Sequence, residues 1–267
     1  MTPFLPEVVK RTLADLEAKR AKEPLVELEK KLSSFPPKKP GALLSKFLGK
    51  EPDTKLICEI KRASPSRGVL LGRLDVRELA QVYEGAGAFA LSVLTQPLGF
   101  HGSLRDLEVA RQAFGGPILR KDFVFDIYQL YETALAGADL VLLIVRILSK
   151  DKLEELVSAS RLLGLLPLVE LHSEEDLDKV SGLEGPLLLG LNARDLASLT
   201  IDHERVEALL REPLGPCPVV IESGIDQREQ VLAYKRHARV CAFLVGEGIL
   251  KSSDPAGKIR ELTGGKI

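Results

Sequence analysis

The feature that most constrains the fold is a regular alternation of short apolar runs with helix-like segments, which begins near residue 55. The helix-like segments, such as 75–87, 126–138 and 149–164, carry apolar residues at three- and four-residue spacing, begin near Asp or Ser and end at Gly. Apolar runs interleaved with helices are typical of parallel strands that are buried on both faces. The runs are 55–61, 89–95, 117–123, 139–145, 166–171, 187–192, 218–223 and 240–246.

Eight such strands fit either an open doubly wound sheet or a closed barrel. Two near-identical passages, AGAFALSVL from Ala86 and AGADLVLLI from Ala136, lie two strand–helix units apart. Such regular repetition favours a closed barrel. The sequence therefore predicts an α/β protein with a single (β/α)8 TIM barrel as its catalytic domain, formed by residues 55–267. A chain of 267 residues is long enough to bury a core of that size.

The first part of the chain, residues 1–54, lies outside this repeat. Its pattern predicts a helix from Glu7 to Leu32 that is interrupted at Pro24, followed by a proline-rich breaker at 33–41 and a short apolar segment. These residues include too few apolar side chains to form a core of their own. We expect an N-terminal helical extension that packs on the barrel.

Composition excludes several classes of protein. The net charge of −1 gives no general attraction to nucleic acid or to an anionic membrane. The sequence contains no apolar run of membrane-spanning length and no secretory signal pattern at its N-terminus. Three scattered cysteines favour neither a disulfide framework nor a zinc site. We therefore expect a cytoplasmic protein that binds no metal, nucleic acid or membrane.

Two further patterns concern rare residues. The chain has no Trp, a single Asn, 16 Pro and abundant charge, which suggests a thermophilic source. Its four histidines, His101, His172, His203 and His237, show no metal-ligand spacing. We expect them to be surface or turn residues, with only His101 near a site.

Polar side chains stand at the carboxyl ends of five apolar runs, where a buried strand should be apolar. Any one of them, taken alone, could equally be an exposed residue at the end of a strand, because burying an unpaired charge is unfavourable. In a (β/α)8 barrel, however, all of these ends face one mouth, where the chemistry occurs. Together they predict an active site there. They are Glu59, Lys61, Lys121, Glu170, Asn192, Arg194, Glu222 and Ser223.

The protonation of Lys121 stays open at this point. Apolar walls or other cations would lower its pKa toward neutrality, which suits a general acid, whereas neighbouring carboxylates would raise the pKa.

Glycine-rich turns follow the seventh and eighth runs, at 222–226 and 245–248. Either could be an ordinary βα turn, but loops after strands seven and eight usually bind phosphate in this barrel, and glycine lets backbone N–H groups approach the anion. We predict one phosphate site, with Ser64 as an added hydroxyl. A serine at position 248 should be tolerated unless the backbone needs a positive φ there. The site residues are Ser64, Ser223, Gly224, Gly246, Glu247 and Gly248.

Five segments of the chain resemble, in order, those of the indole-3-glycerol phosphate synthase family. EIKRASPS at 59–66 and PILRKDF at 117–123 resemble specific first- and third-strand signatures of that family. LTQPLGFHGS at 94–103, GLNARDL at 190–196 and IESGI at 221–225 also fall in register. The resemblance covers essentially the whole chain, including the N-terminal extension. The phosphate loops are shared by many barrels.

The resemblance implies a carboxy-lyase of tryptophan biosynthesis that uses no metal or cofactor. Such an enzyme closes the indole ring of 1-(2-carboxyphenylamino)-1-deoxyribulose 5-phosphate and releases carbon dioxide and water. The resemblance implies Lys121 as the acid that protonates the developing alkoxide and Glu170 as the group that stabilises a cationic intermediate. Lys61, with Glu59 as its partner, would hold the substrate carboxylate and assist dehydration.

The same resemblance assigns the remaining site residues. Asn192 and Arg194 would orient the substrate and the catalytic carboxylates, and Glu222 would bind a substrate hydroxyl. Phe100, Phe123 and Leu196 would line an apolar slot for the anthranilate ring, with Pro65 nearby. We expect a monomer or weak homodimer that acts on a small phosphorylated substrate.

Two departures from the family pattern stand out. Relatives commonly have a hydroxyl residue where Gly248 stands, and some place an aromatic residue, even Trp, in the N-terminal helix.

Three other functions are alternatives for a barrel of this kind. Phosphoribosylanthranilate isomerase relies on a Cys and Asp pair, whereas this mouth offers Lys and Glu. A Schiff-base aldolase would also use a strand lysine. A non-catalytic phosphosugar-binding barrel would not need Lys121 and Glu170.

Overall fold

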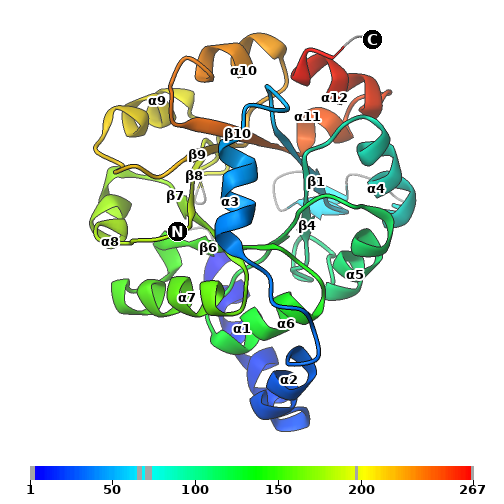
Figure 1. Cartoon of the computed structure of the whole chain (residues 1–267), viewed down its shortest axis with the longest axis vertical. Coiled ribbons are helices and arrows are strands. Elements are labelled where there is room, and N and C mark those ends of the chain that lie inside the picture. The colour runs from blue at the N-terminus through cyan, green and yellow to red at the C-terminus, as the bar shows by residue number, and fades with distance from the viewer. Residues whose placement is uncertain (1–3, 65–67, 70–73, 196–197, 266–267) are drawn as a thin grey trace.

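The computed structural model describes residues 4–64, 68–69, 74–195 and 198–265. Eight parallel strands close into a barrel in the order β1-β10-β9-β8-β7-β6-β5-β4, surrounded by helices (Figure 1). Each of the eight apolar runs contains one of these strands, so the predicted (β/α)8 barrel is confirmed. They are β1 (Leu56–Ile60), β4 (Ala90–Leu94), β5 (Ile118–Lys121), β6 (Leu140–Ile144), β7 (Leu166–Leu171), β8 (Leu188–Asn192), β9 (Val219–Glu222) and β10 (Val240–Val245).

The helices between the strands begin where the sequence indicates. The side chains of Asp75, Asp126 and Ser149 each cap a helix by accepting a hydrogen bond from a backbone N–H of its first turn. The outer helices of the barrel are α4 (Val76–Gly85), α5 (Leu104–Ala113), α6 (Ile127–Leu135), α7 (Lys150–Leu162), α8 (Leu177–Val180), α9 (His203–Arg211), α10 (Arg228–Tyr234), α11 (Glu247–Leu250) and α12 (Pro255–Thr263). Short 3-10 turns η1 (Val145–Ile147) and η2 (Glu174–Asp176) and a small hairpin of β2 (Ala63–Ser64) and β3 (Gly68–Val69) complete these connections.

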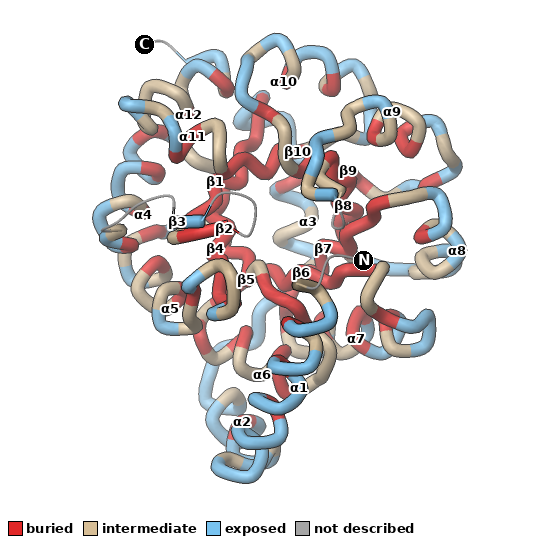
Figure 2. The backbone as a smooth tube through the Cα atoms, turned by 180° about the vertical axis from the view of Figure 1, so that it is seen from behind, coloured by how far each residue is buried: buried red, intermediate tan, exposed pale blue. Residues whose placement is uncertain are grey.

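Side chains along each strand point alternately into and out of the barrel, and both sides are apolar. The inner cluster includes Ile57, Leu119, Leu168 and Val220, whereas neighbours such as Cys58 pack outward against the helices. Figure 2 shows the strands buried at the centre and the helices with both buried and exposed faces.

The N-terminal segment forms three helices, α1 (Phe4–Lys22), α2 (Leu25–Leu32) and α3 (Pro40–Leu48). The break between α1 and α2 falls at Pro24, as predicted, because proline cannot continue a helix. Leu16 and Leu28 pack with Tyr128 of α6 in a small satellite cluster. Lys19 of α1 forms an ion pair of 2.7 Å with Glu132 of α6.

Helix α3 lies across one end of the barrel (Figure 1). Its Phe47 is almost fully buried in the inner barrel cluster, and its ring meets that of Phe89 at 4.9 Å in an edge-on arrangement. Phe89 directly precedes β4, so α3 covers the end at which the strands begin. The carboxyl ends of the strands therefore form the only mouth seen among the described residues.

Candidate active site

The inward alternation of the strands leads directly to the polar residues at the mouth. Four of these residues lie two positions after an inward apolar residue, as Glu59 follows Ile57 and Lys121 follows Leu119. Glu170 follows Leu168 in the same way, and Glu222 follows Val220. The barrel thus brings four charged groups from four strands to one layer above its apolar core.

Lys121 is the centre of this layer. Its Nζ donates to Glu222 Oε2 at 2.8 Å and to Glu170 Oε2 at 3.2 Å. Glu222 is fully buried and Glu170 nearly so. A buried charge is tolerated only when it is paired and hydrogen-bonded, and the three groups meet that condition together.

Gly190 of β8 makes room for Glu222. A β-carbon at position 190 would lie 2.1 Å from Glu222 Oε1, so only glycine fits beside this carboxylate. The residue is therefore required by close approach, because it pairs with Val220 in a strand register that sets it next to the glutamate.

The electrostatics of the cluster settle the protonation that the sequence leaves open. Burial by itself lowers the pKa of Lys121, but the carboxylates of Glu222, Glu170 and Glu59 outweigh it and hold the pKa above its usual value. Burial raises the pKa of Glu170, yet Lys121 and His172 more than compensate and keep that pKa low. Burial raises the pKa of Glu222 to about 8 against the opposing effect of Lys121. Lys121 is thus an acid and Glu170 an ionised carboxylate near neutral pH.

A second ion pair lies across the mouth. Lys61 Nζ and Glu59 Oε1 are 2.5 Å apart, and both side chains are largely buried. Gly246 lies against this pair, because a β-carbon there would be 2.3 Å from Glu59 Oε1 and 3.1 Å from Lys61 Nζ. The turn after β10 therefore reaches the same carboxylate as the end of β1.

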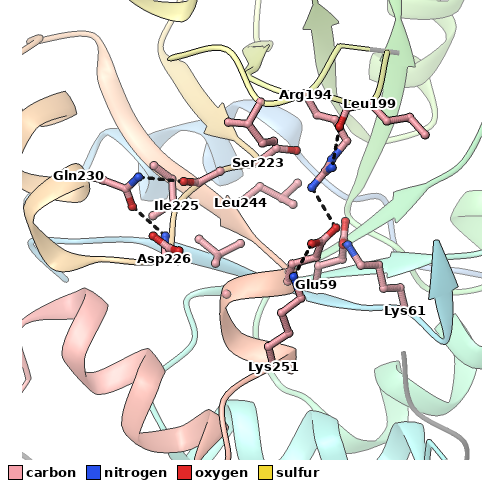
Figure 3. A pocket seen from close by; sticks show the side chains of 16 residues that line it. Glu59, Lys61, Arg194, Leu199, Ser223, Ile225, Asp226, Gln230, Leu244 and Lys251 are labelled. Atoms are coloured by element: carbon pink, nitrogen blue, oxygen red, sulfur yellow. Dashed lines mark hydrogen bonds and ion pairs between the residues drawn. The ribbon is translucent and has the colours of Figure 1, made fainter. Parts of the chain in front are cut away.

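Asn192 and Arg194 form the third group of the mouth. The side chain of Asn192 accepts a hydrogen bond of 3.0 Å from the Arg194 backbone N–H. The guanidinium donates to Leu199 O at 3.0 Å and to Glu247 Oε1 at 2.9 Å. The arginine is therefore held by two neighbouring loops and faces the space between them (Figure 3).

These groups line a cavity of about 130 Å³ that includes Lys121, Glu170 and Asn192 and an apolar wall, and it is called the catalytic cavity below after the role predicted for these residues. Two predicted slot residues, Phe100 and Phe123, belong to that wall. Sequence reasoning missed Phe4 and Leu5 of α1, which also line the cavity; the Phe4 ring meets Phe100 edge-on at 6.0 Å. The family's habit of an aromatic residue in the N-terminal helix was the signal that could have found Phe4. The predicted slot residues Pro65 and Leu196 lie outside the described residues.

An adjoining cavity of about 440 Å³ lies between the turns after β9 and β10 (Figure 3), and it is called the phosphate cavity below after the ligand predicted for these turns. Ser223, Gly224, Gly246, Glu247 and Gly248 line it, as predicted, together with Lys251. Ser64 lines the adjoining catalytic cavity instead. Glu222 lines neither cavity, since it lies behind Lys121.

The turn after β9 has an unusual backbone. Ser223 and Gly224 have φ values of 67° and 74°, which is the left-handed region. A β-carbon on Gly224 would also lie 2.7 Å from Ile201 and 2.8 Å from the His203 ring. Glycine is required there both by conformation and by space.

The expected tolerance of serine at position 248 is wrong. A β-carbon on Gly248 would lie 2.7 Å from the Ile225 carbonyl oxygen and 3.2 Å from Asp226 Cα. Because these are backbone atoms, no side-chain rotation relieves the contact, and the turns after β9 and β10 would have to separate.

The expectation for His172 is also wrong. This residue is fully buried, and its Nε2 lies 3.1 Å from Glu170 Oε1. The two-residue spacing from Glu170 could have indicated this position, because residues 170 and 172 lie on the same side of an extended chain. His101, in contrast, is exposed and lines neither cavity.

The described ranges offer neither a metal-binding cluster nor a membrane-spanning helix. They contain no group of three or more His, Cys, Asp or Glu side chains placed to hold a metal ion. None of their helices combines the length and apolar character that a bilayer span requires.

The comparisons with known proteins agree over nearly the whole chain. Residues 5–262 match the family model described as indole-3-glycerol phosphate synthase. The indole-3-glycerol phosphate synthase of Desulfosudis oleivorans is 40% identical over 263 residues, which cover 98% of this chain and 99% of the relative. Indole-3-glycerol phosphate synthase 1 of Streptomyces coelicolor is 38% identical over 258 residues, which cover 97% and 94%.

Solved structures share the fold at much lower identity. The 3-hexulose-6-phosphate synthase of Salmonella typhimurium has a TM-score of 0.59 at 17% identity and covers 79% of this chain and 97% of its own. The tryptophan synthase α subunit of Legionella pneumophila has a TM-score of 0.58 at 14% identity and covers 83% and 97%. At such identities the likeness shows the barrel alone.

Proposed function

Because the chain belongs to the indole-3-glycerol phosphate synthase family, we propose how the residues at its mouth carry out the reaction of that family. The chain is a carboxy-lyase of tryptophan biosynthesis that acts on a phosphorylated small molecule. It converts 1-(2-carboxyphenylamino)-1-deoxyribulose 5-phosphate to indole-3-glycerol phosphate by ring closure, decarboxylation and dehydration.

Ring closure needs an acid at the substrate ketone. When the aromatic carbon attacks, a carbon–carbon bond forms, the carbonyl π bond breaks and its oxygen takes a proton. Lys121 supplies that proton, since its carboxylate neighbours keep it protonated and it lines the catalytic cavity. The same charge speaks against a Schiff-base aldolase, which needs a free amine.

Decarboxylation follows from a positively charged intermediate. Loss of carbon dioxide returns the bond electrons to the ring. The ionised Glu170 stabilises the positive charge before that step, because an oriented carboxylate in a water-poor cavity acts at low dielectric. Glu222 holds Lys121 from behind and reaches a substrate hydroxyl if the lysine moves.

Lys61, Glu59, Asn192 and Arg194 complete the reaction. Lys61 holds the substrate carboxylate and then gives a proton to the departing hydroxyl, while its partner Glu59 takes the proton from the adjacent ring carbon, so that the C–O and C–H bonds break and the indole double bond forms. Asn192 and Arg194 orient the substrate. Phe100 and Phe123, with Pro65 and Leu196, receive the anthranilate ring.

The substrate phosphate binds in the phosphate cavity. The turns at Ser223 and Gly224 and at 246–248 line it, and Arg194 supplies positive charge. Ser64 contributes from the catalytic side. No metal or cofactor takes part in this scheme.

The wider setting of the enzyme follows from composition. We propose that residues 1–54 and 55–267 fold as one unit and that the enzyme works in the cytoplasm of a thermophile as a monomer or weak homodimer. The free cysteines and a net charge of −1 support that setting, and it involves neither nucleic acid nor membrane.

The observation that carries the mechanism is the buried Lys121 ammonium between two carboxylates at the mouth. Lys121→Ala should lower kcat at least about a hundredfold and leave product binding intact, because the lost proton affects the transition state. Fluorescence of the indole product measures kcat.

The matched control is Lys55→Ala. Lys55 is also buried but lies at the opposite end of the barrel, where its Nζ donates to the Gly49 carbonyl. This variant should lose thermal stability and keep its kcat. A Lys121 variant that retains more than half of the activity would remove Lys121 from the mechanism.

A further inference from the structure

A fully buried imidazole lies beside Glu170 and has no assigned task. His172 directly follows β7 and is not exposed at all. Neither of its ring nitrogens makes an aligned hydrogen bond to a described residue. The other histidines of the outer helices are committed at the surface: His203 Nδ1 to the Tyr234 hydroxyl at 2.9 Å and His237 Nε2 to Glu207 at 3.1 Å. Buried polar groups are rarely left without a hydrogen-bond partner, so we expect His172 to have one.

The nearest polar atom is a catalytic oxygen. His172 Nε2 lies 3.1 Å from Glu170 Oε1, while the second oxygen of the same carboxylate, Oε2, accepts from Lys121 at 3.2 Å. At this separation a small rotation of the ring aligns the two atoms for a hydrogen bond. The two oxygens of Glu170 then have different tasks.

The loop after β7 holds the imidazole in place. The backbone N–H groups of His172 and Ser173 both donate to Asp176 Oδ2, at 2.7 and 3.2 Å. Asp176 and Ser173 also form a capping box at the start of η2. These bonds fix the backbone from which the ring projects, and burial confines the ring itself.

We propose that His172 is a positioning residue, which donates from Nε2 to Glu170 Oε1 and so turns Oε2 toward Lys121 and the reacting ring of the substrate. The inference rests on the role of Glu170 proposed above. The titratable groups that face Glu170 are Lys121 from β5 and Glu222 from β9, and of these only Lys121 is charged near neutral pH. Loss of the histidine donor therefore leaves one cation beside Glu170 and makes Glu170 easier to protonate.

A pair of substitutions separates hydrogen bonding from packing. His172→Gln keeps an N–H donor near the position of Nε2, whereas His172→Met has similar length and volume but no donor. His237→Met is the matched control, because it removes a histidine at the same 3.1 Å from a glutamate, far from the mouth. Each variant is assayed for kcat, KM, melting temperature and the pH dependence of kcat.

We expect His172→Met to lower kcat about tenfold or more, with KM within about threefold, which is the scale of losing a partner behind a functional ligand. The acid limb of its kcat profile should move to higher pH. The Gln variant should keep kcat within about threefold, and the control should match the parent. Equal kcat values for the Met and Gln variants, whether high or low, would overturn the proposal. If the Met variant does not fold, Leu replaces it in the same comparison.

A double substitution ties the effect to Glu170. In a Glu170→Gln background, His172→Met should cost no further activity, because its route of action is gone. A further loss as large as in the parent would overturn the positioning role. If Glu170→Gln alone leaves kcat unchanged, the proposed role of Glu170 itself fails. A large effect of Glu170→Gln beside a silent His172→Met would refute only the present inference.

Discussion

At the scale of single residues, the catalytic cluster has one ammonium for two buried carboxylates. If all three groups were ionised, the cluster would carry an uncompensated negative charge in a place with almost no water. The pKa of Glu222, raised by burial to about 8, shows how this is avoided: Glu222 holds a proton at neutral pH. Glu170, nearer the histidine, keeps the charge.

This proton makes stability depend on pH through Glu222. The folded protein keeps the proton up to about pH 8, whereas the unfolded chain releases it near the ordinary pKa of 4.5. The stabilisation is therefore fully present below the unfolded value and is lost as the pH rises through about 8. Glu222→Gln removes this loss. We expect the melting temperature of the variant, relative to the parent, to be higher at about pH 9 than at about pH 5.

Thermal scans of both proteins at one scan rate measure this difference. A constant offset across the pH range would mean that Glu222 titrates normally in the fold.

The phosphate cavity offers a second test at this scale. Gly224→Ala places a methyl group against Ile201 and His203, which pushes the turn after β9 away from the anion. Losing one hydrogen bond to a charged group costs about 1.5–3 kcal/mol, so KM should rise about tenfold or more while kcat changes little.

Gly215→Ala is the control for this substitution. Gly215 has a φ of +64° but open space around it, so alanine there adds only backbone strain. A KM that rises equally in both variants would attribute the effect to strain and not to the phosphate.

At the scale of elements, we expect α3 to contribute to stability and not to catalysis. Phe47 is buried in the inner barrel, whereas its neighbour Leu48 is 60% exposed. Phe47→Ala should destabilise the fold by about 3–5 kcal/mol, as large-to-small core substitutions do, and leave KM unchanged in the folded fraction. Leu48→Ala should alter stability by less than about 0.5 kcal/mol. Denaturant unfolding with activity measured on the same samples compares them. A Phe47 variant with normal stability would mean that α3 is not anchored by this ring.

The strands and helices were predictable because each is encoded locally. Asp75, Asp126 and Ser149 announce helix starts, and the apolar runs match the strands. The role of the short segment around Phe47 was not predictable, since a nine-residue helix gives no sign of which surface it covers.

The site was predictable where strand parity decides it, as for Glu59, Lys121 and Glu170. It was not predictable where loops meet. The crowding of Gly248 by the Ile225 carbonyl depends on two turns that lie far from each other in sequence. The approach of Phe4 to Phe100 has the same origin, because it depends on how α1 crosses the barrel.

At the scale of the whole molecule, the barrel separates its two ends. The inner side chains below the mouth are apolar from Ile57 around to Leu244, and α3 covers the strand starts. All the predicted polar site residues that the structure describes lie at the other end. Substitutions at the closed end should therefore change unfolding free energies, and substitutions at the mouth should change kinetics.

The catalytic and phosphate cavities share a wall, which fixes the distance between them. Both are lined by Glu59, Lys61, Arg194, Leu199, Ser223 and Glu247. In the proposed scheme the phosphate binds beside β9 and β10 and the acid Lys121 lies on β5, so the distance between them selects the number of carbons that separate phosphate from ketone. When a substrate analogue one carbon shorter is bound by its phosphate, its carbonyl lies more than about 1 Å farther from Lys121 than that of the substrate. Because misplacement on that scale costs about a hundredfold, kcat should fall by that factor, as product fluorescence can show. Equal turnover of the substrate and the analogue would mean that phosphate binding does not set the position of the ketone relative to Lys121.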